Sequence, residues 1–303
     1  MKKILTLLLF CTFQIIFSQN VFKSQKQIYL AQYYSCQKQY QKALDHYLEA
    51  ININPKNPSS DVYLQASAIA FRVKDNITAK KLLTQSITNQ LAPLDFIRGF
   101  KNLKTYQDSE EMKEVLARYD DLENQYFREL KNPKAYMEIQ SLIAKDQLIR
   151  EEENIFQELA NKVDSLNIIK LKELTIKNGW EPRAWVLLWH HRGSFKENDH
   201  VWDFFIPFLQ KEIEKGNVSK NFFVDFEEFN ASKGNRQAPA IYDLCGIGRI
   251  SMNQTYNDIK NLDKRRKSVG LPPLYFGHFL YGMELPKDYE YNPENLLSDL
   301  INL

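Results

Sequence analysis

Apolar residues recur every three or four positions along most of this chain, which is the spacing of a helix with one buried face. The clearest stretch covers residues 30–55 and predicts two helices, the second of which ends at Pro55. Each predicted helix places small and large apolar residues on one face: Leu30, Ala31 and Tyr34 on the first, Ala43, Tyr47 and Ala50 on the second. Small residues let two helices approach closely, and large ones fill the groove beside them. The pattern therefore predicts a packed helix pair.

A second helix pair follows a polar turn at residues 56–61. Its predicted contact positions again hold mostly small residues: Ala66, Ser67 and Ala70, then Ala79, Leu83 and Ser86. Ala79 follows Ala43 by 36 residues, close to the period of about 34 residues in tetratricopeptide repeats. Both pairs resemble such repeats, and residues 94–116 resemble the segment that often closes an array, with short helices around Leu103 and Val115. The resemblance implies a scaffold that carries no chemistry of its own.

The helical pattern continues from Leu122 with more charged residues. Residues 134–160 predict one buried stripe: Ile139, Leu142, Ile143, Leu148, Ile155 and Leu159. Asp164 or Ser165 could cap the next helix. The buried face of that helix would hold Ile168, Leu171 and Leu174. Its fourth member would be either Thr175 or Ile176.

Later segments predict further helices from residue 181, over residues 205–213, and over residues 256–270. Glycine and proline, the usual helix breakers, number only 10 and 11 in 303 residues. The whole pattern predicts an all-α protein in which a short tetratricopeptide-like helical array is followed by a second, mostly helical domain.

The first residues have the composition of a secretory signal peptide. Lys2 and Lys3 precede an uncharged apolar run over residues 4–17, and Ser18 is a small residue at its end. This run is shorter than the roughly 20 apolar residues of a membrane span. We therefore expect cleavage after Ser18, no stable membrane anchor, and a periplasmic or secreted bacterial protein. The predicted parts are a signal peptide (1–18), the repeats (19–121), a C-terminal helical domain (122–285) and a tail (286–303).

The net charge indicates which classes of partner are not expected, and the cysteine content indicates whether a disulfide is expected. The formal charge is +2, and removing residues 1–18 with their two lysines leaves zero. A neutral chain has no general attraction for nucleic acid or anionic lipid, so we expect neither as a partner. Cys36 and Cys245 remain, one in each half of the chain, and we expect free buried thiols rather than a bridge.

The residues with the most distinctive chemistry gather between positions 180 and 202, which hold all four tryptophans and three of the five histidines. Trp185, Leu188 and Trp189 share a helical face and predict a core, so His190 and His191 point elsewhere. Adjacent helical residues diverge by about 100°, which suits a shared metal ion poorly. No His-Glu-x-x-His spacing occurs either, so we expect no metal and no cofactor. His191 could act as an acid, base or orienting group, or could be structural.

A basic run at residues 264–267 ends the last predicted helix. Cations stabilise a helix C-terminus, which is sufficient to explain the run. Alternatively, Arg265 or Arg266 could bind a carboxylate or phosphate with two hydrogen bonds.

Residues 146–274 resemble a bacterial family catalogued as domain of unknown function 6624. The resemblance rests on ordered short motifs: Asp146-Gln147-x-x-Arg150, Val163-Asp164-x-x-Asn167, Gly179-Trp180, His190-His191, Asp263-x-Arg265-Arg266 and Gly270-Leu271-Pro272-Pro273-Leu274. The chain departs from the family at residues 225–228 and 240–243, where the family usually has an Asp-Arg pair and a Tyr-Gly-Thr-Gln-like string. The resemblance implies an architecture and no reaction.

Two functions are compatible with these features. The first is an exported helical scaffold that binds a protein or peptide partner, with Tyr33 and Tyr40 either anchoring that partner in a groove or packing internally. The alternative is a cleft of the C-terminal domain that binds or hydrolyses a polar ligand, or a degenerate form of such an enzyme. His191 would be its base, Asp164 would orient His191, and Arg266 would bind the anion. Further ligand contacts would come from Asp146, Arg150, Asn167 and Arg265.

Overall fold

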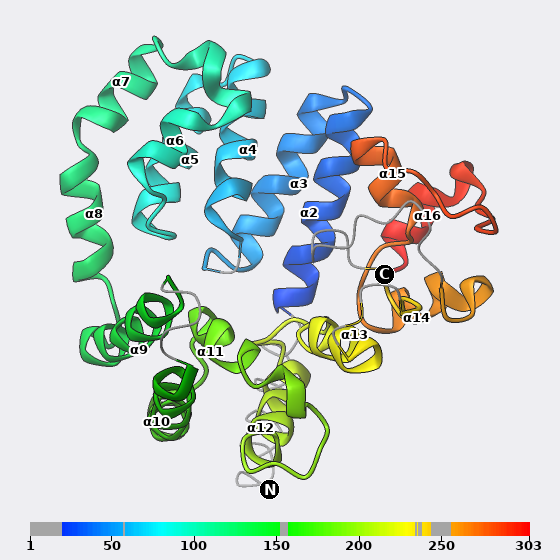
Figure 1. Ribbon diagram of the computed structural model, residues 1–303. Coiled ribbons are helices and arrows are strands. Elements are labelled where there is room, and N and C mark those ends of the chain that lie inside the picture. The colour runs from blue at the N-terminus through cyan, green and yellow to red at the C-terminus, as the bar shows by residue number, and fades with distance from the viewer. Residues whose placement is uncertain (1–19, 57, 152–156, 234, 236–237, 244–255) are drawn as a thin grey trace, which may run out of the picture. The chain divides into compact units, whose positions relative to one another are not determined.

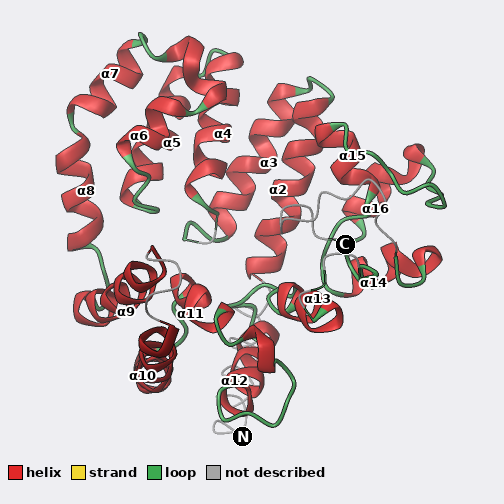
Figure 2. Cartoon of the chain, in the orientation of Figure 1, coloured by secondary structure: helices red, strands yellow, loops and turns green. Residues whose placement is uncertain are grey.

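The protein is all-α, as predicted (Figure 2). The computed structural model describes residues 20–56, 58–151, 157–233, 235, 238–243 and 256–303, and within these ranges it contains no strand. An isolated bridge joins Ala240 to Tyr256. The predicted signal peptide lies outside the described residues. No described helix is both long enough and apolar enough to cross a membrane.

The chain forms two compact units whose boundaries differ from the predicted ones. The first unit contains the described residues up to 129 together with 213–221 and 257–303. The second contains the described residues of 130–212 and 222–256. The segment predicted as one C-terminal domain (122–285) is therefore divided between the two units, and the predicted tail (286–303) belongs to the first.

The first unit begins with neighbouring helices, drawn from blue to green in Figure 1. Its helices are α2 (Asn20–Cys36), α3 (Tyr40–Ile53), α4 (Ser60–Arg72), α5 (Asn76–Thr88), α6 (Leu94–Gly99), α7 (Glu110–Ala117), α8 (Tyr119–Arg128), α14 (Leu262–Ser268), α15 (Tyr275–Tyr281) and α16 (Leu296–Ile301). Helix α2 packs on α3, α3 on α4, α4 on α5, and α5 on α7 and α8. The small residues expected at these contacts are fully buried: Ala31, Ala43, Ala50, Ala66, Ala70 and Ala79.

The two helix pairs use the same turn. Lys38 follows α2 and Lys74 follows α4, and both adopt the left-handed conformation, with φ of 57° and 66°. In each turn, two successive N–H groups donate to carbonyls three and five residues back: Lys38 to Ser35, Gln39 to Tyr34, Lys74 to Phe71 and Asp75 to Ala70. These bonds satisfy carbonyls at the end of the first helix. Every residue of one turn corresponds to the residue 36 positions later in the other.

The end of the first unit differs from the prediction. The expected long helix over residues 256–270 is short, since a 3-10 turn (Ile259–Asn261) is followed by the brief α14. Helices α15 and α16 then pack against α2. A buried apolar cluster joins them: Leu30, Phe276, Leu296 and Leu300. The predicted tail is therefore part of the core of this unit.

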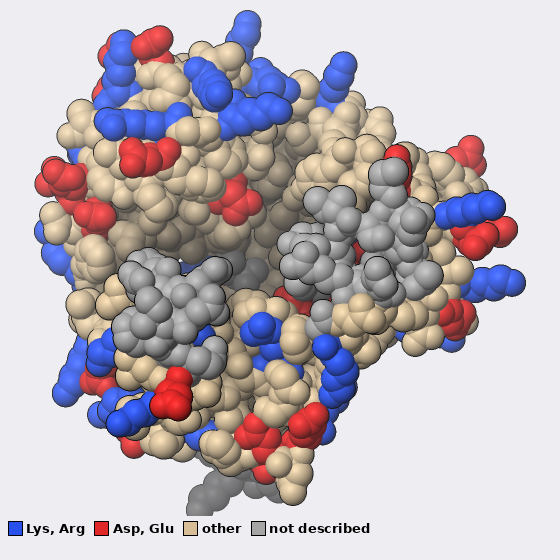
Figure 3. Space-filling view, viewed as in Figure 1, with Lys and Arg blue, Asp and Glu red and all other residues tan. Residues whose placement is uncertain are grey.

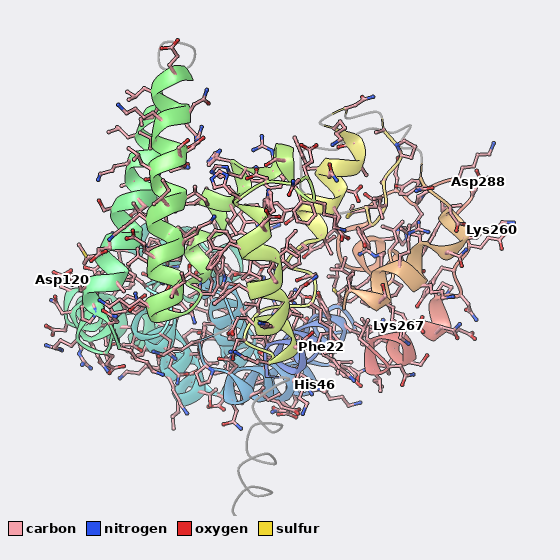
Figure 4. All side chains as sticks on the ribbon, turned by 90° about the horizontal axis from the view of Figure 1, so that it is seen from below. Phe22, His46, Asp120, Lys260, Lys267 and Asp288 are labelled. Carbon is pink, nitrogen blue, oxygen red and sulfur yellow. The ribbon has the colours of Figure 1, made fainter. Side chains whose placement is uncertain are left out.

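Phe22, labelled in Figure 4, lies at the start of α2 and is close to two later segments of the first unit, at Lys220 and Gly270. The ammonium of Lys220 lies 4.2 Å from the centre of its ring. Gly270 adopts a φ of +78°, and a Cβ added there would lie 2.7 Å from the Phe22 ring. The neighbouring backbone N–H of Val21 donates to the carbonyl of Gly216. A side chain at position 270 would therefore disturb this contact.

The second unit holds α9 (Pro133–Glu151), α10 (Gln157–Asn178), α11 (Trp185–Trp189), α13 (Val224–Ser232) and most of α12 (Trp202–Glu214). Phe226 is fully buried at its centre, in contact with the rings of Trp185, Trp189 and Trp202. The tryptophans thus contribute to the core, as expected. Trp185 and Trp189 themselves stack on each other at 5.1 Å.

Several predictions for the second unit and for Cys36 were wrong in detail. Asp164 and Ser165 lie inside α10 and do not cap it. Leu148 and Leu159 are exposed rather than buried, and Thr175, not Ile176, faces the core. Ile155 and Cys245 lie outside the described residues, and Cys36 is exposed rather than buried.

The surface carries charges of both signs. Lysine and arginine side chains and aspartate and glutamate side chains all occur on the face shown in Figure 3.

Candidate functional site

Five of the seven side chains predicted to line one cleft belong to the second unit. Asp146 and Arg150 lie one turn apart on α9, and Asp164 and Asn167 lie three residues apart on α10. His191 lies two residues after the end of α11, immediately before a 3-10 turn (Arg192–Ser194). Residues three or four apart share a helical face, so α9 and α10 each present a polar pair.

Arg150 connects the two helices. Its Nη2 donates to Asp146 Oδ1 at 3.0 Å and to Asp164 Oδ1 at 2.5 Å. The Asp146 side chain is almost fully buried, whereas Arg150 and Asp164 are partly exposed. Breaking such a buried pair leaves an uncompensated charge, so the contact holds α9 against α10.

Asp146 has further partners on its second oxygen. Gln147 Nε2 donates to Oδ2 at 2.6 Å, and His190 Nε2 lies 3.1 Å from the same atom, although its N–H is not aligned for a hydrogen bond. Burial alone would raise the pKa of Asp146, but His190, Arg150 and Gln147 outweigh it and lower that pKa to about 2. Asp146 is therefore an anion in the folded protein.

His190 was not among the predicted site residues. The sequence indicated only that His190 and His191 diverge, and no local pattern places Asp146 opposite one of them. The contact between His190 and Asp146 depends on how α9 packs against α11. The sequence offered no signal for it beyond the two adjacent histidines.

His191 is partly buried among acidic residues. Burial lowers the pKa of His191, and the nearby charges of Asp164 and Asp199 offset this effect only in part. Its imidazole is therefore neutral at pH 7 and able to accept a proton. The backbone carbonyl of His191 accepts a hydrogen bond from Trp202 Nε1 at 2.9 Å, which fixes the segment to the core.

Arg192 is a second residue that the sequence analysis missed. Its guanidinium lies 4.7 Å from the ring centres of both Trp189 and Phe229, and its Nη1 donates to the Trp189 carbonyl at 2.8 Å. Burial, together with the charge of Arg150, lowers the pKa of Arg192. The two guanidinium groups therefore lie close enough to repel each other.

The other predicted ligand residues have structural contacts. Asn167 is buried, and its Nδ2 donates to the Leu142 carbonyl at 3.3 Å, which ties α10 to α9. Arg265 and Arg266 belong to the first unit, where Arg265 contacts the Asp258 carbonyl and Arg266 Nε donates to the Pro272 carbonyl at 2.8 Å. The structure does not place these two arginines with the network of the second unit.

The two predicted partner-binding tyrosines are half-buried. Tyr33 stacks on Phe279 of α15 at 5.2 Å. The hydroxyl of Tyr40 accepts a hydrogen bond from Arg72 at 2.9 Å, and the Arg72 guanidinium lies 4.8 Å from the Tyr40 ring. Each ring packs internally on one side and keeps part of its surface in solvent.

A cavity of about 290 Å³ lies between α9 and α10. Its wall is largely charged and amide-bearing: Asn132, Lys134, Ala135, Glu138, Lys170, Glu173, Leu174, Lys177 and Asn178. None of these residues belongs to the network around Asp146. No group of three or more His, Cys, Asp or Glu among the described residues is arranged to hold a metal ion.

The chain matches no known family model, no curated protein and no solved structure. The likeness to tetratricopeptide repeats and to domain of unknown function 6624 therefore stays a prediction, and the function has to be argued from the geometry.

Proposed function

We propose that the protein is an exported helical scaffold, periplasmic or secreted, that binds a protein or peptide partner. The observation that carries this proposal is the repetition of one helix pair, with one turn geometry, at an offset of 36 residues. Repeated pairs of this kind build extended binding surfaces. The network of the second unit supports the same view, because both oxygens of Asp146 already have partners within the protein.

Buried serines make each pair rigid. Ser24 of α2 donates to the Ala50 carbonyl of α3 at 2.9 Å, and Ser67 of α4 donates to the Ala79 carbonyl of α5 at 3.0 Å. A buried hydrogen bond between helices fixes their spacing and register. A rigid surface loses little conformational entropy on binding, which favours a scaffold role.

The surface best suited to a partner lies at the turn between α2 and α3. We call it the tyrosine–cation surface, and it comprises Tyr34, Tyr40, Lys42, His46 and Arg72. The Lys42 ammonium lies 5.3 Å from the Tyr34 ring centre, and that ring stacks on His46 at 5.2 Å. Half-buried rings beside exposed cations suit a segment that carries carboxylates and apolar side chains. We infer an acidic peptide segment as the partner.

Site-specific photocrosslinking tests this proposal. A photoreactive amino acid replaces exposed Lys42 in cells that make the protein, and the control position is Lys113, an exposed lysine of α7. We expect one protein to be captured from position 42 and not from position 113. With the purified partner, the Lys42→Glu/Arg72→Glu variant should weaken binding tenfold or more. Equal capture from both positions would reject the surface.

A second candidate function is supported by two unpaired donors. The buried Nε atoms of Arg150 and Arg192 make no hydrogen bond in the described protein. Buried donors normally have an acceptor, so a carboxylate or phosphate could fill that role beside neutral His191. The second unit would then bind, or hydrolyse, a small anionic ligand.

Tryptophan fluorescence tests this alternative, since all four tryptophans lie in the second unit. Thermal unfolding is followed with added phosphate, acetate and citrate. A stabilisation that disappears in Arg192→Ala and His191→Ala would support anion binding. An unchanged melting temperature with all three anions would reject it.

A further inference from the structure

Helix α10 carries a second apolar face on the side away from its core contacts. Its buried side holds Ile168, Leu171, Leu174 and Thr175. Its opposite side exposes four large apolar residues: Leu159 (44% exposed), Leu166 (58%), Ile169 (54%) and Ile176 (71%). Helices α9 and α10 are seen lengthwise in green in Figure 4. Exposed apolar rows of this length commonly mark interaction surfaces.

The exposed residues follow a heptad pattern. Leu166 follows Leu159 by seven residues, Ile169 follows Leu166 by three, and Ile176 follows Ile169 by seven. Exposed Lys162 and Glu173 occupy the two remaining positions of the same row. These six positions correspond to the a and d sites of a coiled coil, where each residue meets a partner helix. We call this row the α10 seam.

The α10 seam is symmetric about the midpoint between Asn167 and Ile168. Two copies of α10 in antiparallel orientation would form three kinds of contact, each of them twice: Leu159 with Ile176, Lys162 with Glu173, and Leu166 with Ile169. Apolar residues then meet apolar residues, and the lysine meets the glutamate. A parallel pair in register would instead face Lys162 with Lys162 and Glu173 with Glu173, which is repulsive.

We propose that the protein self-associates through the α10 seam as an antiparallel homodimer. A twofold axis brings the same surface of both copies together, which is the usual geometry of a dimer. The inference does not rest on the proposed function, since the seam lies in the second unit and the tyrosine–cation surface in the first. Helix α10 has 22 residues, so one helix pair buries less than the roughly 1,600 Å² of a standard interface. We therefore expect a dissociation constant on the order of 10–100 μM.

Sedimentation equilibrium of the purified chain from about 5 to 500 μM measures this association. We expect a monomer–dimer equilibrium that Leu166→Glu abolishes. Ile77→Glu is the matched control, because Ile77 is equally apolar and highly exposed but lies on α5. Circular dichroism and tryptophan fluorescence of each variant verify that it is folded.

Charge reversal tests the orientation. Lys162→Glu alone and Glu173→Lys alone should each weaken the dimer at least tenfold, because like charges would face each other. Mixing the two single variants should restore a heterodimer, and the double variant should restore a homodimer. A monomer up to 500 μM, a dimer that survives Leu166→Glu, or a mixture that stays monomeric would overturn the proposal.

Discussion

At the scale of single residues, the network around Asp146 is mainly a structural tie. Asp146, Arg150 and Asp164 belong to the short motifs on which the family resemblance rests, and in the structure their side chains form one hydrogen-bonded network. Their contacts were not predictable, since they depend on the packing of α9 against α10 and α11. The sequence therefore identified the polar residues but not their partner His190.

Replacing Asp146 by Asn tests this tie. The folded-state pKa of Asp146 lies at about 2, below its ordinary value of 3.8. Its stabilisation is therefore fully present above about pH 4 and is lost as the pH falls toward 2. We expect Asp146→Asn to lower the free energy of unfolding of the second unit by about 2–4 kcal/mol at pH 7. Urea unfolding followed by tryptophan fluorescence should show the difference shrinking from pH 5 to pH 3.

Asp203→Asn is the control for that experiment, since Asp203 is an exposed carboxylate of α12 in the same unit. It should change the stability of the second unit by less than about 0.5 kcal/mol. If the loss of unfolding free energy in Asp146→Asn did not change with pH, it would not come from the charge of the Asp146 carboxylate.

At the scale of elements, α10 explains why one part of the prediction failed. Helix α3 has a single apolar face, and the three residues predicted on that face, Ala43, Tyr47 and Ala50, are all buried. Helix α10 has apolar residues on two opposite faces, so periodicity alone does not say which face is buried. This ambiguity left Thr175 and Ile176 as alternatives. The burial of Leu159 was predicted wrongly for another reason, since residues 134–160 were taken as one buried stripe, whereas α9 ends at Glu151 and Leu159 belongs to α10.

A pair of lysine substitutions on α10 separates the two faces. Thr175→Lys would place an ammonium in the core, and we expect a loss of about 3 kcal/mol or more in the second unit. Ile176→Lys, one residue away, should cost less than about 1 kcal/mol because its side chain is exposed. Urea unfolding at low micromolar concentration, where a weak dimer dissociates, compares them. Equal losses would contradict the orientation of α10.

The contact between Gly270 and Phe22 gives a second test at this scale. Gly270→Ala introduces a Cβ at a positive φ and 2.7 Å from the Phe22 ring. We expect the first unit to lose about 1–3 kcal/mol. Gly99→Ala is the matched control, because a Cβ at Gly99 meets no atom within 4 Å. Unfolding followed by circular dichroism should show a loss for Gly270→Ala only.

At the scale of the whole molecule, segments distant in sequence complete each unit. The all-α class was predictable from helical periodicity, and so were most helices of the first unit. The placement of residues 286–303 was not, because periodicity shows that a segment has an apolar face but not what covers it. Leu296 and Leu300 cover Leu30, which lies near the opposite end of the sequence.

Removing residues 286–303 should therefore destabilise the first unit, whereas removing a solvent-exposed tail would leave its stability unchanged. The single substitution Leu300→Ala leaves a cavity, and we expect it to lower the free energy of unfolding of the first unit by about 2–4 kcal/mol. Ile301→Ala, at a neighbouring exposed position, should be nearly neutral. Limited proteolysis within α2 should accelerate in the truncated chain and in Leu300→Ala. A truncated chain as resistant as the full one would contradict the packing of α16 on α2.

The packing of α16 on α2 also has a consequence for biosynthesis. A ribosome makes Leu30 about 270 residues before Leu300, and at about 5–20 residues per second the interval is roughly 15–55 s. During that interval the apolar side of α2 around Leu30 stays uncovered, so the first unit cannot finish folding however early α2 to α5 form. A nascent chain in this condition presents the apolar side of α2 to water, and exposed apolar surface of this kind is what chaperones bind.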